Sequence, residues 1–312
     1  MGKIAFVFPG QGSQYVGMGR ELVESFSEAA AVYEEAAAIL GKEFIDIIFN
    51  GPEETLKQTS VTQPAILTAS VACLRVLEAN GVRPQCVAGH SLGEYSAHVA
   101  AGTFSFSAAL KVVRERGRLM QEAVPHGGAM AAVLGLDREL VEGACRKASD
   151  HGLAEVANYN CPGQVVISGQ AAGVEAAMAY CKEAGAKRVM PLAVSGPFHS
   201  SMMAPAGEQL GEVLAQVDFK APGLPLVANI NSDYVKTRES VATSLIQQVS
   251  SSVRWEEGIR QLHTDGADVF VEVGPGKVLT GLIKKILPGT GTLNVEDKSS
   301  LEKSLAYLKE SR

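Results

Sequence analysis

Short apolar runs and amphipathic stretches alternate along the amino-terminal part of the chain, an order that is typical of α/β proteins. The run KIAFVF at 3–8 is β-branched and aromatic, so it predicts a strand, which the glycine-rich loop PGQGSQ ends. The stretches 21–40 and 64–78 carry apolar residues at helical spacing and predict helices with one buried face. The apolar run 86–88 predicts a second strand, which leads directly into the loop GHSLG at 89–93 and a further predicted helix.

Between Gly127 and Gly196 the pattern changes to shorter elements in the order strand, helix, strand, strand, helix, strand. The predicted strands are 129–135, 154–158, 164–168 and 188–194, and the predicted helices are 137–150 and 171–185. This is the ferredoxin-like order. Because such a unit can bury its own core and be inserted into a larger domain, we expect 127–196 to form an inserted subdomain.

The larger α/β pattern surrounds this insertion on both sides. A helix at 107–124 precedes it, and strands and helices alternate again after it, at 226–229, 239–249, 255–264, 268–273 and 277–287. We therefore expect 1–126 and 197–312 to form one large α/β catalytic subdomain.

The composition is that of an ordinary globular protein, with 46% apolar and 20% charged residues among 312. Its 28 Lys and Arg against 34 Asp and Glu leave a net charge of −6, so we expect neither nucleic acid nor a membrane surface as a partner. The longest uncharged stretch, 189–207, contains three prolines and a histidine, which a lipid-exposed helix tolerates poorly. Five cysteines without a CxxC pair indicate neither a metal site nor a disulfide framework, which favours a cytoplasmic location.

The motif Gly89-His90-Ser91-Leu92-Gly93 fits G-x-S-x-G between a predicted strand and a predicted helix. Glycines flank the serine because the sharp turn brings neighbouring backbone too close for side chains, and the turn exposes the hydroxyl. The backbone N–H of Leu92 and the start of the helix face negative charge that develops on a carbonyl beside Ser91. A glycine-rich turn can match this motif by chance, but its context favours a nucleophile.

A serine nucleophile needs a base within hydrogen-bond reach. His199 is the first candidate, because it lies where the predicted insertion returns to the large subdomain and such junctions favour clefts. His263, near the end of a predicted helix, is the second. No acidic residue near His199 is an obvious partner, so we expect a Ser-His dyad whose imidazole a backbone carbonyl orients.

Arg116 is the candidate for binding an acidic substrate. On the helix 107–124 it lies close to the apolar side, whereas Arg114 and Arg118 reach solvent. One interpretation is that Arg116 only extends along apolar surface to reach water. The other is that it enters the cleft, where its planar fork would bind a carboxylate with two hydrogen bonds.

Two further glycine motifs do not indicate nucleotide binding. GPGKV at 274–278 lacks the spacing of a phosphate-binding loop and has valine where magnesium requires a hydroxyl. The loop at 10–15 lacks the third glycine of the dinucleotide fingerprint. Gln11 in that loop could donate to an oxyanion, or it could be an ordinary polar turn residue.

Together these motifs resemble the bacterial malonyl-CoA:acyl carrier protein transacylases, from about residue 3 to about residue 295. The motifs are FPGQGSQ at 8–14, TQPAI at 62–66, GHSLGEYSA at 89–97, RG near 116, NYNCPGQVVISG at 158–169, PFHS at 197–200 and VGPGKVLTGLIKKI at 273–286. The resemblance implies an α/β-hydrolase-like large subdomain with an inserted ferredoxin-like one. It also implies transfer of malonyl from malonyl-CoA to the phosphopantetheine thiol of an acyl carrier protein, in fatty-acid or polyketide synthesis, without a bound cofactor.

Carried over position by position, the resemblance makes Ser91 the nucleophile, His199 its base and Arg116 the clamp for the malonyl carboxylate. It places the oxyanion donors at the backbone N–H groups of Gln11 and Leu92. The resemblance further implies that the backbone carbonyl of Gln248 orients His199, with the adjacent Gln247 as the alternative. It implies that His90 and Phe198 line the substrate site.

Carrier proteins of this kind are acidic, so a chain of net negative charge needs a local basic patch to bind one. Lys284 and Lys285 are the first candidates and Lys187 and Arg188 the second, against the alternative of ordinary solvated helix ends. Two other functions remain: a thioesterase or esterase that uses the same serine with water, and a carrier-binding scaffold without catalysis.

Overall fold

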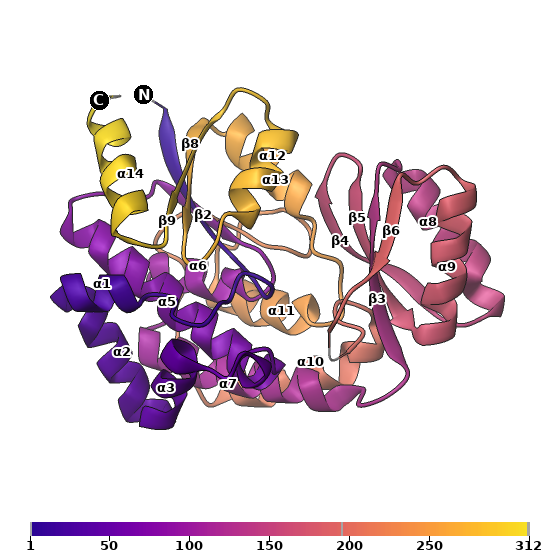
Figure 1. Cartoon of the computed structure of the whole chain (residues 1–312), viewed down its shortest axis with the longest axis horizontal. Helices are drawn as coiled ribbons and strands as arrows, with labels where there is room; N and C mark the ends of the chain where they lie inside the picture. The colour runs from indigo at the N-terminus through magenta and orange to yellow at the C-terminus, as the bar shows by residue number, and fades with distance from the viewer. Residues whose placement is uncertain (1, 195, 311–312) are drawn as a thin grey trace.

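The computed structural model describes residues 2–194 and 196–310, which form two separate sheets with helices packed around them (Figure 1). The larger sheet has five strands in the order β7-β2-β1-β8-β9, and all its pairings are parallel. These strands are β1 (Lys3–Phe8), β2 (Cys86–Gly89), β7 (Leu226–Val227), β8 (Ala267–Val273) and β9 (Gly291–Val295). The chain is therefore an α/β protein.

Helices cover both faces of this sheet, as a parallel sheet requires. Alternate side chains of β1 point to opposite faces of the sheet. Ile4, Phe6 and Phe8 pack in the larger hydrophobic core on one face, and Ala5 and Val7 pack in a smaller core on the other face. The helices that follow β1 and β2 are α1 (Arg20–Ser25), α2 (Ser27–Leu40), α3 (Lys42–Asn50), α4 (Glu53–Leu56), α5 (Thr59–Ala79), α6 (Gly93–Ala100) and α7 (Phe106–Ala123). The later helices of the same unit are α10 (Ala204–Ala215), α11 (Arg238–Gln248), α12 (Trp255–Thr264), α13 (Val278–Ile286) and α14 (Lys298–Glu310).

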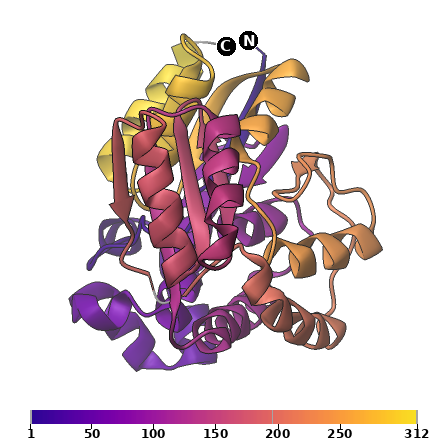
Figure 2. The same ribbon diagram turned by 90° about the vertical axis from the view of Figure 1, so that its right-hand side faces the viewer.

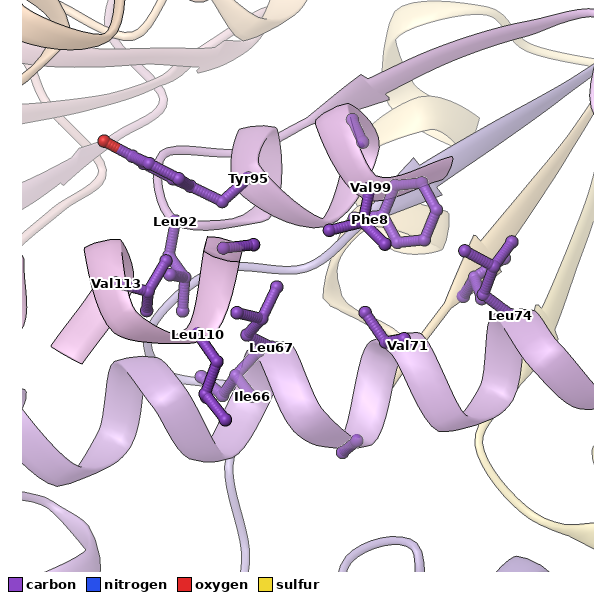
Figure 3. Packing of buried hydrophobic residues seen from close by; sticks show 14 of the residues in the cluster. Phe8, Ile66, Leu67, Val71, Leu74, Leu92, Tyr95, Val99, Leu110 and Val113 are labelled. Carbon is purple, nitrogen blue, oxygen red and sulfur yellow. The ribbon is translucent and has the colours of Figure 1, made fainter. Parts of the chain in front are cut away.

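Helix α5 is the central helix of the larger core. Figure 3 shows Ile66, Leu67, Val71 and Leu74 of this helix pointing toward side chains of β1, α6 and α7. The helix is long and apolar enough to span a bilayer, but 83% of that apolar window is buried inside the protein. Its apolar character is therefore that of a core helix.

The second sheet has four strands in the order β4-β5-β3-β6, and all its pairings are antiparallel. Figure 2 shows helices packed in front of this sheet. Its elements are β3 (Gly128–Leu134), α8 (Arg138–Lys147), β4 (Ala154–Cys161), β5 (Gln164–Gln170), α9 (Ala171–Glu183) and β6 (Arg188–Pro191). The predicted ferredoxin-like order is confirmed. Residues of this sheet, α8 and α9 form a core cluster of their own, so the unit buries its own apolar surface as expected of an insertion.

Three predicted elements differ from the structure. The predicted helix 21–40 is two helices, because Phe26 takes an extended conformation (φ −136°) and packs against the core. The predicted strands 226–229 and 188–194 end early, at Val227 and Pro191. Helices α3 and α10 and strand β9 were not predicted, since each is short or carries apolar residues without a clear period.

Candidate active site

The loop GHSLG forms a sharp turn between β2 and α6, at the carboxyl edge of the parallel sheet. Ser91 has φ 50°, a left-handed conformation that a serine adopts only when its surroundings hold it there. A Cβ on Gly89 would lie 1.9 Å from the carbonyl carbon of Gly93, and one on Gly93 would lie 2.0 Å from the carbonyl oxygen of Phe8. Both glycines are therefore sterically required, for the reason the motif predicted.

His199 lies against this turn. Its Nε2 is 2.7 Å from Ser91 Oγ, and its Nδ1 is 2.9 Å from the carbonyl oxygen of Gln248 and 3.2 Å from that of Ser251. Because carbonyl oxygens only accept hydrogen bonds, Nδ1 carries the proton and Nε2 is free to accept one from the serine. Of the two adjacent glutamines named from the sequence, it is the carbonyl of Gln248 that lies at hydrogen-bond distance from Nδ1.

The imidazole of His199 stays uncharged near neutral pH. Burial lowers its pKa to about 3, and the positive charge of Arg116 acts in the same direction. A neutral imidazole with a free Nε2 beside a hydroxyl is the arrangement that a general base requires.

Arg116 is buried beside the same hydroxyl, with 1% of its surface exposed. Its Nη1 donates to Gln63 Oε1 at 2.7 Å, and its Nη2 donates to Gln248 Oε1 at 2.9 Å and to Ser91 Oγ at 3.2 Å. The side chain of Arg116 therefore lies at the Ser91 hydroxyl and does not extend along apolar surface to reach water. Arg114 and Arg118 on the same helix are exposed, as predicted.

The other predicted site residues surround this centre in different ways. His90 Nε2 lies 2.8 Å from Asn160 Oδ1 of β4, and its ring packs on Trp255, so His90 connects the turn to the smaller sheet. Phe198, beside His199, is buried. Leu92 points its side chain into the core (Figure 3). The side chain of Gln11 donates to Thr59 Oγ1 at 3.2 Å.

His263, the second candidate for the base, lies elsewhere. Its Nδ1 is 2.9 Å from the carbonyl oxygen of Ala267, the first residue of β8. Since the strands are parallel, the start of β8 is at the opposite edge of the sheet from Ser91. His263 therefore cannot serve as the base for Ser91.

A cleft of about 850 Å³ leads to His199 between the two sheets. One wall consists of the segment 250–252 and Arg254, and the other of β4 and α8, including Glu142, Arg146 and Tyr159. The predicted cleft at the junction of the two units is thus present, and it gives a substrate a route to the imidazole.

Three polar residues that hold the site together were not identified from the sequence as functional. Asn229 Oδ1 accepts from the backbone N–H of Ser91 at 2.7 Å, and its Nδ2 donates to the Gly89 carbonyl at 2.7 Å. Gln63 binds Arg116, and Glu94 accepts from Gln248 Nε2 at 2.7 Å. The available signal for Asn229 was its position just after β7, because polar residues at the carboxyl ends of parallel strands often line sites.

Comparison with known proteins places this site in a family. A family model described as an acyl transferase domain matches residues 5–300. The malonyl CoA-acyl carrier protein transacylase of Bacillus subtilis is 48% identical over 312 residues, covering 99% of this chain and 98% of the relative. That of Escherichia coli K12 is 43% identical over 307 residues, covering 98% of this chain and 99% of the relative.

Solved structures agree. The malonyl CoA-acyl carrier protein transacylase of Clostridium perfringens superposes with a TM-score of 0.96 at 41% identity, over 99% of this chain and 98% of that one. A structure of a type II PKS acyl-carrier protein in complex with its malonyl-transacylase gives 0.95 at 43% identity, over 98% and 99%. Fold and site together thus define an acyl transferase. Within that class, the chain belongs to the family of malonyl CoA-acyl carrier protein transacylases.

The contacts of Asn229 predict a specific loss of stability. In Asn229→Ala the N–H of Ser91 and the carbonyl of Gly89 lose their partner in a buried turn, so the free energy of unfolding falls by about 2 kcal/mol or more. Urea unfolding measures this change. Asn231→Ala, which removes only exposed contacts to Asp233, is the matched control. Equal stability of the two variants would contradict the role of Asn229 in holding the turn.

Proposed function

We propose that this enzyme transfers the malonyl group from malonyl-CoA to the phosphopantetheine thiol of an acyl carrier protein, as the names of its relatives state for them. The observation that carries the proposal is that the buried guanidinium of Arg116 lies within hydrogen-bond distance of the Ser91 hydroxyl. His199 Nε2 is within hydrogen-bond distance of the same hydroxyl. A cation in that position favours an acyl group that ends in a carboxylate.

In the first half of the reaction Ser91 acts as the nucleophile. His199 Nε2 takes the hydroxyl proton while Oγ attacks the thioester carbonyl of malonyl-CoA. The oxyanion lies against the backbone N–H groups of Gln11 and Leu92, at the start of α6, whose helix dipole also favours negative charge. The tetrahedral intermediate collapses to a malonyl ester of Ser91, and the imidazolium returns its proton to the departing CoA sulfur.

In the second half the thiol of the carrier protein takes the place of CoA. His199 removes its proton, the sulfur attacks the malonyl ester, and Ser91 recovers its proton when the ester bond breaks. No bound cofactor takes part, because CoA arrives on the donor and phosphopantetheine on the acceptor. Binding of the donor and acceptor in turn to one cleft gives ping-pong kinetics.

The experiment that tests this function is incubation with malonyl-CoA, with and without holo acyl carrier protein, followed by mass spectrometry of both proteins. We expect a malonyl ester on the peptide that contains Ser91, and its movement to the carrier protein when that is added. Rapid loss of the ester to water in the absence of carrier would indicate a thioesterase. The absence of any ester would indicate a scaffold without catalysis. A cytoplasmic location is part of the proposal, because the five cysteines are free thiols, as is usual in a reducing compartment.

Selectivity for malonyl depends on Arg116. In Arg116→Ala we expect kcat/KM for malonyl-CoA to fall about 100-fold or more, because the carboxylate loses a charged partner in a buried site. Turnover of acetyl-CoA is spared or rises, since an acetyl group has no carboxylate for the guanidinium to bind in the native enzyme. Arg114→Ala, an exposed residue on the same helix, is the control. Equal losses for both acyl groups would remove Arg116 as the carboxylate clamp.

For the carrier protein we propose a basic patch of Lys284, Lys285, Lys187 and Arg188. All four side chains are exposed. Lys285 Nζ lies 3.3 Å from Gln164 Oε1, and Gln164 and Arg188 pair with the same residue, Leu134, from the two sides of β3. These contacts put Lys285 and Arg188 at the same end of the smaller sheet, and Lys284 and Lys187 are their neighbours in the chain. This supports the proposed patch, because clustered cations attract an acidic partner.

Charge reversal tests the patch. Lys284→Glu with Lys285→Glu should raise KM for the carrier protein roughly tenfold at low ionic strength and leave KM for malonyl-CoA unchanged. The double variant Lys303→Glu, Lys309→Glu on α14 makes the same charge change elsewhere on the surface. If both double variants behave alike, Lys284 and Lys285 are not part of the carrier site.

A further inference from the structure

Glu94 is a second buried ionisable residue near Arg116, and it takes part in none of the catalytic steps above. Its side chain is 0% exposed, on the first turn of α6. One carboxylate oxygen accepts from Gln248 Nε2 at 2.7 Å and from the backbone N–H of Asn229 at 3.0 Å. The other lies 3.4 Å from Ser244 Oγ. A carboxylate removed from water in this way requires a compensating positive charge.

The side-chain amide of Gln248 connects this carboxylate to the guanidinium. Its Oε1 accepts from Arg116 Nη2 at 2.9 Å, and its Nε2 donates to Glu94. The amide thus lies between a cation and an anion, and its dipole is aligned with both. The same residue supplies the backbone carbonyl that holds His199 Nδ1, so Glu94 is coupled to the clamp and to the base through one residue.

The other titratable groups around Glu94 are uncharged near neutral pH. On its own helix, burial lowers the pKa of His98 to about 3 and raises the pKa of Tyr95. The His98 Nε2 lies 4.0 Å from Glu94, and His199 lies beyond Arg116 with a lowered pKa. From α11 and the segment after β7, the facing groups are Ser244, Gln248 and Asn229, which do not titrate. Arg116 of α7 is therefore the charge that faces Glu94.

We propose that Glu94 is the counter-ion of Arg116 in the empty site, and that it takes up one proton from solvent when the malonyl carboxylate binds the guanidinium. This inference rests on the proposed function. Two carboxylates that share one guanidinium in a site closed to water repel each other, and protonation of the carboxylate that is not on the substrate relieves the repulsion. The proton returns to solvent when malonyl leaves for the carrier protein.

The pKa of Glu94 in the empty site makes this exchange possible at physiological pH. Burial raises it to about 7, while the hydrogen bonds from Gln248 and Asn229 and the charge of Arg116 oppose the rise. Bound malonyl adds a negative charge and raises it further. Well below pH 7 Glu94 is neutral in both states and malonyl binds most tightly; well above the raised pKa it is ionised in both, and malonyl binds most weakly. Proton uptake occurs in the window between.

The first test uses the native enzyme. In a weakly buffered solution with a pH indicator near pH 7, acylation of Ser91 by malonyl-CoA should consume a substantial fraction of one proton per site. In addition, KM for malonyl-CoA should be about fivefold to tenfold lower near pH 6 than near pH 8.5. Acetyl-CoA carries the same CoA group without the carboxylate, so its KM corrects for titration of CoA. The absence of proton uptake during acylation would overturn the proposal.

The second test removes the charge but keeps the shape. In Glu94→Gln the amide oxygen can still accept from Gln248 and Asn229, so the proposal predicts loss of the proton uptake and of the pH dependence of KM. At high pH, KM for malonyl-CoA should fall, a gain that a merely structural residue would not give. Glu272→Gln is the matched control: Glu272 is also 0% exposed with a raised pKa, but it binds the start of α13.

The outcomes separate this proposal from the proposed function. Proton uptake that persists in Glu94→Gln would overturn Glu94 as the acceptor, and uptake that is lost there but kept in Glu272→Gln would support it. If Glu94→Gln does not fold, the measurement on the native enzyme decides. Failure of malonyl to form an ester on Ser91 at all would instead contradict the proposed function.

Discussion

A guanidinium held out of water beside a serine hydroxyl is the interaction on which the rest of the site depends. Burial of Arg116 is unfavourable by itself, and burial lowers the pKa of Arg116 for that reason. Side-chain oxygens from α5 and α11 accept its hydrogen bonds, and the carboxylate of Glu94 offsets its charge through Gln248. The packing of α5, α6 and α11 therefore brings Gln63, Glu94 and Gln248 together around one buried cation.

The two sheets position different parts of the site. The parallel sheet places Ser91 at the carboxyl end of β2, where the turn and the start of α6 converge. The smaller sheet closes the cleft, and it is tied to the segment that orients the base: Tyr159 N–H donates to the Val253 carbonyl at 2.9 Å, and Val253 N–H donates to the Ala157 carbonyl at 2.8 Å. Two residues before Val253, the Ser251 carbonyl accepts from His199. The position of the imidazole thus depends on both units.

The sequence was sufficient where a local pattern carried the chemistry. The G-x-S-x-G turn predicted Ser91, helical spacing put Arg116 on the apolar side of α7, and the order of short elements predicted the antiparallel sheet. It was insufficient for Asn229 and Glu94, since the bond from Ser91 to Asn229 spans 138 positions and that from Gln248 to Glu94 spans 154. Hydrogen bonds between residues so far apart in the sequence form only in the packed fold, and the hydrophobic periodicity of the sequence does not predict them. The break at Phe26 is of the same kind, because tertiary packing overrides a continuous helical pattern there.

The most direct test of the central claim is a crystal structure of the enzyme loaded with malonyl-CoA in the absence of an acceptor. The account predicts an ester at Ser91 Oγ whose free carboxylate receives hydrogen bonds from both Nη groups of Arg116, with the carbonyl oxygen at the N–H groups of Gln11 and Leu92. The imidazole of His199 would remain on the carbonyls of Gln248 and Ser251. A malonyl group attached elsewhere, or a carboxylate directed to solvent with Arg116 unchanged on Gln63 and Gln248, would contradict it.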